Sequence, residues 1–390
     1  MPEPQPYPLR VATFNIEDLR TEEVSDPESP RAKAAAAVIQ ELAPDVVLIN
    51  ELTYDQAAGP AWQPGSQEGQ NGQRFADNFL AVSQGDGLEP RRYRSFMRPS
   101  NTGVPSGYDF DNDGVAVTEP PELPPATADP ETRRQTAEGR AYGADNWGFG
   151  TFPGQYSMAL LVREDFEILE NQARTFQLLP WSAMPDALAP ADPETGEAWY
   201  SELEWAEFRL SSKSHWDVPV RLPNGAVLHF LVSHPTPPAF DGPEQRNRKR
   251  NHDEIRFWAD YLNGAEYIVD DNGVAGGLAA DASFVILGDL NADPQKGRSL
   301  ENPIGRFLLE HPRVQGDFTP TARYAGIDPE WAELDDADTS DWGMRIDYVL
   351  PSMDLEIEDG AVERPATEAA RVSDHFPVWA DLAVQPIGPR

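Results

Sequence analysis

Cysteine is absent from this chain of 390 residues, which excludes disulfide bonds, thiolate nucleophiles and cysteine-ligated zinc together. Basic residues are scarce relative to acidic ones, since 31 Lys and Arg face 66 Asp and Glu, a formal charge of −35. Such a charge repels the phosphates of duplex DNA at long range, so binding to a duplex would need a concentrated basic patch. We interpret the charge mainly as a solvated acidic surface, and note that carboxylates can also concentrate divalent cations.

Long apolar runs are missing as well. The stretch from residue 226 to 232 is interrupted by His229 and is far shorter than the roughly 20 residues that cross a bilayer, so no transmembrane segment is expected. The first residues, MPEPQPYPLR, lack the basic and apolar regions of a signal peptide. A protein trimmed of its export signal would look the same, and we favour a secreted or periplasmic location over a cytoplasmic one.

The composition is otherwise that of a folded protein, with 39% hydrophobic and 10% aromatic residues. Residues 9–16 are rich in strand formers, and Ser29 and Pro30 introduce an Ala-rich helix over 30–42. The nearly continuous apolar run 45–50 is typical of a strand covered on both faces. Further strands are expected at 156–163, 165–169, 218–221, 226–233, 283–288, 345–350 and 376–383, and further helices at 72–83 and 247–263.

One domain over 9–384 is the organisation we expect, because the chain shows no short repeat and no Ser/Gly-rich linker. Residues 1–8 are interpreted as a Pro-rich flank. The range 84–150 holds much of the Gly, Pro, Asn and Asp and has little periodicity. It is predicted to be a long loop insertion within the domain, and such loops are often functional.

Polar side chains stand where several of these apolar strands end. Rigid strand ends of one sheet can bring such groups into a single site. Phosphate-ester hydrolysis needs a hard cation held by carboxylates, a group that orients water, and donors for the phosphoryl oxygens. A lone Asp or Asn at a strand end is usually a turn former, but an ordered series of them favours a site. The residues are Asn15, Glu51, His234, Asp289, Asn291, Asp347, Asp374 and His375.

The motifs around these residues resemble those of the endonuclease/exonuclease/phosphatase superfamily, the deoxyribonuclease I-like metal-dependent phosphoesterases. They are TFNIEDL (13–19), PDVVLINEL (44–52), VSHPTPP (232–238), ILGDLNADP (286–294), RIDYVLPS (345–352) and SDHFPV (373–378). The resemblance implies a four-layer α/β sandwich, in which two packed central β-sheets are flanked by helices and the site lies at one edge. Asn50 stands where Gln is common, and PTPP follows His234 in place of an apolar residue, which suggests a distinct, acidic, bacterial-type subfamily.

The same resemblance implies a role for each residue. Glu51 would be the principal ligand of a divalent metal, Mg²⁺ or Mn²⁺ with Ca²⁺ as an alternative, and Asn15 and Asp374 would lie beside it. Asp289 and Asn291 would orient the attacking water and the scissile phosphate. His234 and His375 would contact phosphate oxygens or move protons, and Asp347 would hold His375 in one tautomer. The number of metal ions and the general base stay open.

A basic stretch, RNRKRNHDEIRFW (246–258), follows His234. Arginine forks match phosphate oxygens, so Arg248, Arg250, Asn251 and His252 are candidates for binding a leaving group or a second phosphate. The alternative is a solvated helix start whose basic residues pair with nearby carboxylates.

Asp109, Asp111 and Asp113, followed by Gly114, reproduce the first half of a calcium loop. The twelfth position is Pro120 instead of the bidentate Glu, so a complete EF-hand is absent. A structural Ca²⁺ at these carboxylates and an ordinary acidic turn are both open.

The function predicted from the sequence is hydrolysis of a phosphodiester or phosphomonoester by metal- and His/Asp-assisted attack of water. The substrate would be a small molecule or a nucleic acid, and no protein partner is implied. A secreted nuclease is the main alternative. A non-catalytic binding protein on the same fold is disfavoured, because the carboxylate, amide and imidazole positions are intact.

Overall fold

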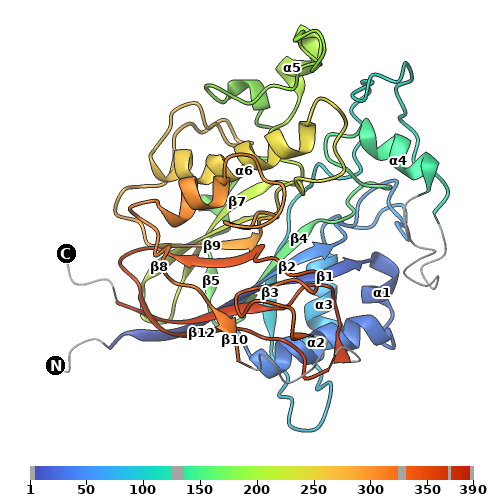
Figure 1. Ribbon diagram of the computed structural model, residues 1–390. Helices are drawn as coiled ribbons and strands as arrows, with labels where there is room; N and C mark the ends of the chain where they lie inside the picture. Colours follow the sequence, from blue (N-terminus) through green and yellow to red (C-terminus); the bar gives the residue numbers. More distant parts are fainter. Residues whose placement is uncertain (1–4, 124–135, 324–330, 368–369, 387–390) are drawn as a thin grey trace.

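Two β-sheets packed face to face, with helices on their outer faces, form the computed structural model of this protein (Figure 1). The structure describes residues 5–123, 136–323, 331–367 and 370–386. Three apolar clusters separate the layers, one between the sheets and one beneath the helices on each side. The predicted four-layer α/β sandwich is therefore confirmed.

The first sheet has seven strands in the order β10-β12-β13-β1-β2-β4-β3. β1 runs parallel to β2 and antiparallel to β13, so the first and last long strands of the chain are neighbours. This arrangement brings the N-terminal and C-terminal motifs to one edge of the sandwich. The strands are β1 (Tyr7–Leu19), β2 (Val46–Leu52), β3 (Tyr93–Phe96), β4 (Met158–Arg163), β10 (Thr321–Ala322), β12 (Glu356–Val362) and β13 (Val378–Val384).

The second sheet has six strands, five of them in the order β11-β9-β8-β7-β5, with β6 also paired to β7. β8 and β9 are parallel, and β9 and β11 are antiparallel, with Asp347 opposite Asp289 in the register. The two motifs that carry these carboxylates are thereby placed side by side. The strands are β5 (Glu167–Ile168), β6 (Arg174–Thr175), β7 (His215–Arg221), β8 (Val227–Ser233), β9 (Phe284–Asp289) and β11 (Asp347–Pro351).

Helices cover the outer face of each sheet. In Figure 1, α2 and α3 lie below the seven-stranded sheet and α6 lies above the other. No helix in the described part of the chain is long and apolar enough to cross a membrane. The helices are α1 (Thr21–Ser25), α2 (Pro30–Leu42), α3 (Asn71–Phe75), α4 (Ala137–Ala144), α5 (Glu202–Glu207) and α6 (Arg246–Leu262), with π-helical turns η1 (Ala76–Leu80) and η4 (Ile304–Leu309) and 3-10 turns η2 (Glu170–Gln172) and η3 (Trp181–Ala183).

Alternation along β2 shows how one strand serves two apolar layers. Val46 and Leu48 pack into the cluster between the sheets, whereas Val47 and Ile49 pack beneath the helices. All four are 0–1% exposed. The prediction that 45–50 is a strand covered on both faces is therefore confirmed, and its rigidity fixes the position of the residue that follows it, Glu51.

The helix predicted over 30–42 is confirmed as α2 with the same bounds. Ser29 Oγ accepts a hydrogen bond from the Ala32 N–H at 3.4 Å, and Pro30 occupies the first turn. This is the expected N-cap chemistry. The helix ends at Leu42, and the C-cap residue Ala43 has a left-handed backbone.

Several predicted extents are wrong. The range 84–150 is not a loop throughout, because β3 pairs with β4 at the edge of the first sheet and α4 follows at Ala137–Ala144. The expected flank 1–8 is shorter, since Tyr7 already pairs with Val384. The helix expected at 72–83 is α3 continued by a π-helical turn and ends at Leu80. Residues 1–4 and 124–135 lie outside the described residues.

The cluster between the sheets generates a stability prediction. Leu287 on β9 is fully buried there. Leu287→Ala removes buried methyl groups and leaves a cavity, so the free energy of unfolding should fall by about 2–5 kcal/mol in chemical denaturation. Val82→Ala, at a side chain that is 54% exposed, is the control and should change it by less than about 0.5 kcal/mol. Equal effects of the two substitutions would contradict the placement of Leu287 in the core.

Candidate active site

The ends of β1 and β2 present Asn15 and Glu51 to the same edge of the sandwich. Asn15 pairs with Asn50 across the two strands, and the register shifts directly after it. The backbone is left-handed at Glu17 (φ 54°), Asp18 (φ 49°) and Glu51 (φ 65°). Such conformations cost on the order of 1–3 kcal/mol each for residues other than glycine, and they gather at functional sites. The paired strands hold these residues in a geometry that they would not favour alone.

The side-chain amide of Asn15 is the centre of the site. Its Nδ2 lies 3.1 Å from Glu51 Oε1, 3.1 Å from Asp289 Oδ2 and 3.3 Å from His375 Nε2. Its oxygen accepts the Glu17 N–H at 3.0 Å, which fixes the orientation of the amide. Asn15 is fully buried. The amide of Asn15 on β1 therefore donates to Glu51 on β2 and to Asp289 on β9, and it lies beside His375 from the segment before β13.

Asn50, the departure from the more common Gln, joins the two sheets. Its side-chain oxygen accepts the Asp289 N–H at 3.3 Å and the Thr13 hydroxyl at 3.2 Å. The shorter amide thus reaches the backbone at the end of β9. This contact sets the distance between Glu51 on one sheet and Asp289 on the other.

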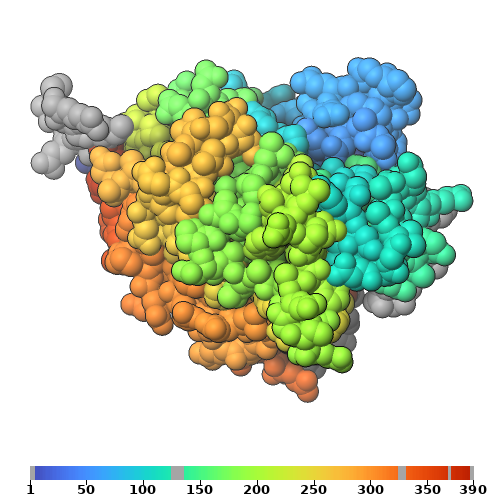
Figure 2. Space-filling model, turned by 90° about the horizontal axis from the view of Figure 1, so that it is seen from above, coloured from blue at the N-terminus to red at the C-terminus, as the bar shows by residue number. Residues whose placement is uncertain are grey.

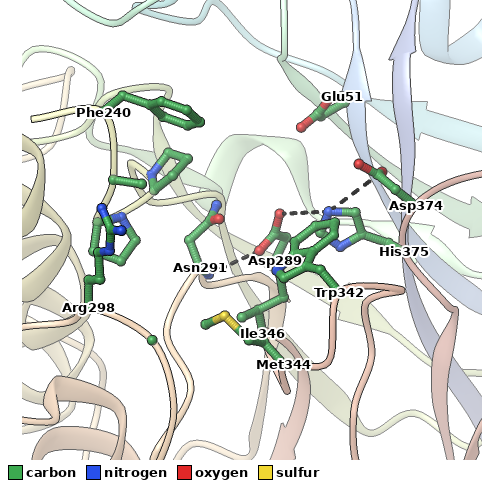
Figure 3. A pocket seen from close by; sticks show the side chains of 14 residues that line it. Glu51, Phe240, Asp289, Asn291, Arg298, Trp342, Met344, Ile346, Asp374 and His375 are labelled. Atoms are coloured by element: carbon green, nitrogen blue, oxygen red, sulfur yellow. Dashed lines mark hydrogen bonds and ion pairs between the residues drawn. The ribbon is translucent and has the colours of Figure 1, made fainter. Parts of the chain in front are cut away.

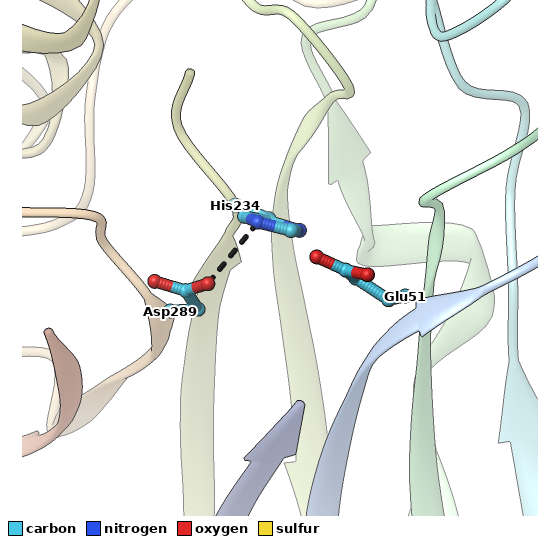
Figure 4. Close-up of side chains that lie close together, drawn as sticks. All are labelled: Glu51, His234 and Asp289. Carbon is cyan, nitrogen blue, oxygen red and sulfur yellow. Dashed lines mark ion pairs between the residues drawn. The ribbon is translucent and has the colours of Figure 1, made fainter. Parts of the chain in front are cut away.

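The second sheet contributes Asp289 and His234, which lie opposite Glu51 (Figure 4). His234 Nε2 is 3.3 Å from Asp289 Oδ2. Asn291 donates its backbone N–H to Asp289 Oδ1 at 3.0 Å, and its amide donates to the Pro235 carbonyl at 3.1 Å. The GDLN turn and the loop after His234 are thereby held together.

His375 and Asp347 form a buried pair beside this group. His375 Nδ1 lies 2.9 Å from Asp347 Oδ2, and the same carboxylate oxygen accepts the Thr339 hydroxyl at 2.7 Å. His375 Nε2 is 3.7 Å from Asp289 Oδ2 and 3.9 Å from Asp374 Oδ1. When Nδ1 carries a hydrogen, it donates that hydrogen to Asp347, and Nε2 is the ring atom that faces the other carboxylates.

Burial and charge shift the pKa values of several groups in the site. Burial raises the pKa of Glu51 to about 7, and the carboxylate of Asp374 adds to the rise. Burial lowers the pKa of His234 to about 4, so this imidazole is neutral at pH 7. Burial also opposes the charge of His375, but the carboxylates of Asp347 and Asp289 outweigh it and raise its pKa well above 6.5. The two imidazoles thus differ in charge.

The donor set fits a hard divalent cation. Glu51, His234 and Asp289 offer ligand atoms that all lie within 4.8 Å of one another. Among the described residues, no Lys or Arg forms an ion pair with Glu51 or Asp289. Oxygen-rich sites with uncompensated negative charge suit Mg²⁺ or Mn²⁺. Asn15 and Asp374, the other predicted ligands, lie next to Glu51 and close the group.

A cavity of about 530 Å³ opens in front of these side chains (Figure 3). Glu51, Asp289, Asp374 and His375 line one part of its wall. Its other lining residues include Phe240, Arg298 and Trp342. All eight residues that the sequence motifs point to are therefore together at one edge of the sandwich, seven of them at or beside this cavity and Asp347 behind His375.

The four predicted substrate-binding residues do not form one phosphate-binding surface. Arg250 is 4% exposed, and its guanidinium donates to the carbonyls of Leu210, Trp147, Arg209 and Ser211. The amide of Asn251, which is fully buried, donates to the carbonyls of Thr236 and Leu290. These contacts tie α6 to the loops that precede β7 and follow β8 and β9, and substrate binding by the two residues stays a prediction.

Arg248 and His252 also have protein partners. Arg248 pairs with Asp241 at 3.4 Å, and His252 Nδ1 lies 2.8 Å from Asp253 Oδ1 while its ring packs against Phe307. The alternative interpretation of the stretch, a helix whose charged residues pair locally, describes these two residues. The charge pattern of the sequence did not show that several polar side chains of α6 lie on its buried face.

Asp109, Asp111 and Asp113 present carboxylate oxygens within 4.8 Å of one another. Asp109 accepts the backbone N–H groups of Asp113 and Gly114 at 3.1 and 2.8 Å. These bonds are also those of an acidic turn. A structural Ca²⁺ at this loop stays a prediction.

Sequence reasoning missed several side chains that face the site. Lys213 is 6% exposed and its ammonium adds to the lowering of the pKa of His234. Trp342 meets the His375 ring edge-on at 5.2 Å. Phe240 is 93% exposed on the loop after His234. None of them lies in a motif, and only the fold brings them near the site.

A family model described as the Endonuclease/Exonuclease/phosphatase family matches residues 12–375. The chain belongs to this family of phosphoesterases. The predicted resemblance is thereby confirmed over nearly the whole sequence. No curated protein matches the chain.

Solved structures with a similar fold come from several bacteria. An endonuclease/exonuclease/phosphatase from Beutenbergia cavernae is 18% identical, with a TM-score of 0.49, over 97% of this chain and 72% of that one. A family member from Bacteroides thetaiotaomicron is 12% identical, with a TM-score of 0.47, over 98% and 96% of the two chains. A mannosyl-6-phosphatase from the same species is 13% identical, with a TM-score of 0.45, over 96% and 99%. None is similar enough to transfer a substrate.

The raised pKa of Glu51, about 7, generates a pH prediction. Protons and a metal ion compete for the same carboxylate. The affinity for Mn²⁺, measured by calorimetry from pH 8 to pH 6, should be flat above the pKa and fall by about tenfold per pH unit below it. In Glu51→Gln the affinity should be low at every pH. Equal affinities of the natural protein at pH 6 and pH 8 would contradict this role of Glu51.

Proposed function

We propose that this protein is a divalent-metal-dependent hydrolase of phosphate esters, acting on phosphodiester or phosphomonoester bonds. The observation that carries the proposal is the convergence of Glu51, Asp289 and His375 on the amide of Asn15. These four residues come from four separate segments of the chain. Burying carboxylates and imidazoles together costs desolvation energy, and apolar side chains would stabilise a fold without that cost. Buried carboxylates and imidazoles whose pKa values are shifted mark catalytic sites.

Glu51 would hold the metal ion, with Asn15 and Asp374 beside it. When bound, Mg²⁺ or Mn²⁺ supplies positive charge that polarises the phosphoryl oxygens. Asp289 and Asn291, on the turn after β9, are placed to orient the attacking water and the scissile phosphate. Their positions are supported by the Asn50 and Pro235 contacts, which fix that turn relative to Glu51.

The imidazoles would contact the phosphoryl group in different ways. His375 as an imidazolium can donate from Nε2 to a phosphoryl oxygen or to the leaving group, while Asp347 stabilises its charge through Nδ1. His234 is neutral at pH 7 because of its low pKa, and it can accept or donate depending on its tautomer.

A nuclease acting on single strands is a second candidate. Phe240, which is 93% exposed, and Trp342, which is 49% exposed, both line the cavity. Exposed aromatic side chains stack on bases and contribute about 1–3 kcal/mol per base. A panel of p-nitrophenyl phosphate, bis-p-nitrophenyl phosphate, a short single strand and plasmid, each with and without EDTA, separates a small-substrate hydrolase from a nuclease and from a non-catalytic binding protein.

Removing the charge of Glu51 tests the metal dependence. Glu51→Gln keeps the size but removes the charge that a hard cation requires, so kcat should fall by about a hundredfold or more while folding persists. Glu358→Gln, at an exposed position of β12, is the control and should behave as the natural protein. Full activity of Glu51→Gln, or undiminished turnover in excess EDTA, would refute the proposal.

The pairing of Asp347 and His375 predicts strong non-additivity. Asp347→Asn and His375→Ala should each lower kcat by about a hundredfold or more, and the double variant should be scarcely slower than the slower single variant. His229 and Asp217 provide a matched control, because they form a similar pair at 2.6 Å on β8 and β7. His229→Ala should leave kcat unchanged. Losses that add in free energy would show that Asp347 and His375 act independently.

A further inference from the structure

A second cavity, of about 650 Å³, adjoins the first. Glu51, Pro237 and Phe240 line both of them. His234 and Lys213 line the second cavity on the side of the catalytic carboxylates, and α4 with the residues after it lines another part. A substrate group bound at Glu51 could therefore extend into this second space without leaving the protein surface.

The wall of this cavity opposite Glu51 comes from residues 84–150, the range predicted to be a loop insertion. Asp111, Arg140 and Phe149 line it from that range. Figure 2 shows the corresponding teal segment as one flank of the molecule, next to the green segment that carries α5. The insertion thus has a structural role at the site, since it encloses space that the sandwich alone would leave open.

The charge in this cavity is opposite to that of the whole protein. The formal charge of the chain is −35, yet basic side chains predominate in the cavity wall. Lys213, Arg140, Arg246 and Arg250 face the carboxylates of Glu51 and Asp111. A cavity wall with the average composition of this chain would be acidic. The excess of basic side chains in this one therefore indicates a ligand of negative charge.

Two of these cations have no ion-pair partner. Among the described residues, neither Lys213 nor Arg246 has a carboxylate oxygen within 4.0 Å, whereas Arg248 and Arg256 on the same helix are paired with Asp241 and Asp260. Buried or half-buried cations usually have such a partner. Lys213 is near the carboxylates of Glu254, Glu51 and Asp289, and Arg246 is near those of Glu244 and Asp111. None of these carboxylates contacts either cation directly, so an anionic ligand can do so.

Within the described ranges, these side chains contact neutral oxygen acceptors and no carboxylate, and the Tyr200 hydroxyl is one neighbour of Arg246. Arg246 donates one N–H to the Ala144 carbonyl at 3.0 Å, and a guanidinium has five. Lys213 Nζ has only a long contact of 3.4 Å to the Pro235 carbonyl. Arg250, by contrast, is occupied by four carbonyls and supplies charge alone. Lys213 and Arg246 therefore retain donors for an anion, and Arg140 lines the same cavity.

We propose that this second cavity is an anion subsite that holds a second phosphoryl group of the substrate, bound by Lys213, Arg246 and Arg140, while the scissile phosphate lies at Glu51 and Asp289. The inference rests on the proposed function and gives it a substrate class, esters that carry two phosphoryl groups. These are small bisphosphates or strands in which a neighbouring phosphodiester supplies the second group. Arg248, predicted from sequence, is outside the subsite.

Binding of inorganic phosphate to the metal-free full chain tests the subsite without turnover. Calorimetry should show one phosphate bound, with an affinity about tenfold lower in Arg246→Gln and in Arg140→Gln. Arg140 lies on an exposed face of α4, so its replacement cannot unfold the core, whereas thermal melting checks Arg246→Gln. Arg256→Gln, which removes a paired arginine from the same helix, is the matched control. Equal affinity in all variants overturns the proposal.

Kinetics with matched substrates then identify the source of the second group. Thymidine 5′-(p-nitrophenyl phosphate) is compared with its 3′-phosphorylated form, and fructose 6-phosphate with fructose 1,6-bisphosphate. In Arg140→Gln and Arg246→Gln, KM should rise by about tenfold for whichever bis-phosphorylated member the protein uses, with little change for its partner. Equal KM changes within each pair overturn the subsite. If no substrate is hydrolysed, the proposed function fails, and phosphate binding still decides on the subsite.

Discussion

The site depends on the burial of several carboxylates between two sheets with too few positive charges to balance them. Glu51 and Asp289 approach each other from opposite sheets, and the amide of Asn15 bonds to both. Burial raises the pKa of Glu51, and repulsion from the neighbouring carboxylate of Asp374 adds to the rise. A bound divalent cation would relieve this repulsion. The same constraint explains why His375 is held as an imidazolium beside Asp289 and Asp347.

The fold maintains this arrangement through local strain and rigid support. Glu17, Asp18, Glu51 and Asn291 all have left-handed backbone, and each lies at or just after the end of a fully paired strand. On the other side, Glu254 of α6 accepts the N–H groups of Ser212 and Thr236 at 2.6 and 2.7 Å, which joins the segment of Lys213 to the loop after His234. The buried face of α6 therefore positions both cavities, although none of its residues is catalytic.

The sequence was sufficient to predict the bounds of α2 and the polar strand ends, because apolar periodicity and capping residues are local properties. The four layers were implied by the resemblance of its motifs to the superfamily. The sequence did not predict β3, because this four-residue strand shows no pattern other than a buried aromatic residue at each end. The role of Arg250 was also out of reach, since its acceptors are carbonyls 39 to 103 positions away. Lys213 stood in no motif, and its importance follows only from the burial that the tertiary structure imposes on it.

The location of a bound metal ion tests the central claim most directly. Crystals soaked with Mn²⁺ and phosphate should show an anomalous peak within about 2–2.6 Å of a Glu51 carboxylate oxygen, with a phosphate oxygen among its other ligands. Anomalous signal near Asp109, Asp111 and Asp113 alone, with none at Glu51 under saturating Mn²⁺, would contradict the account.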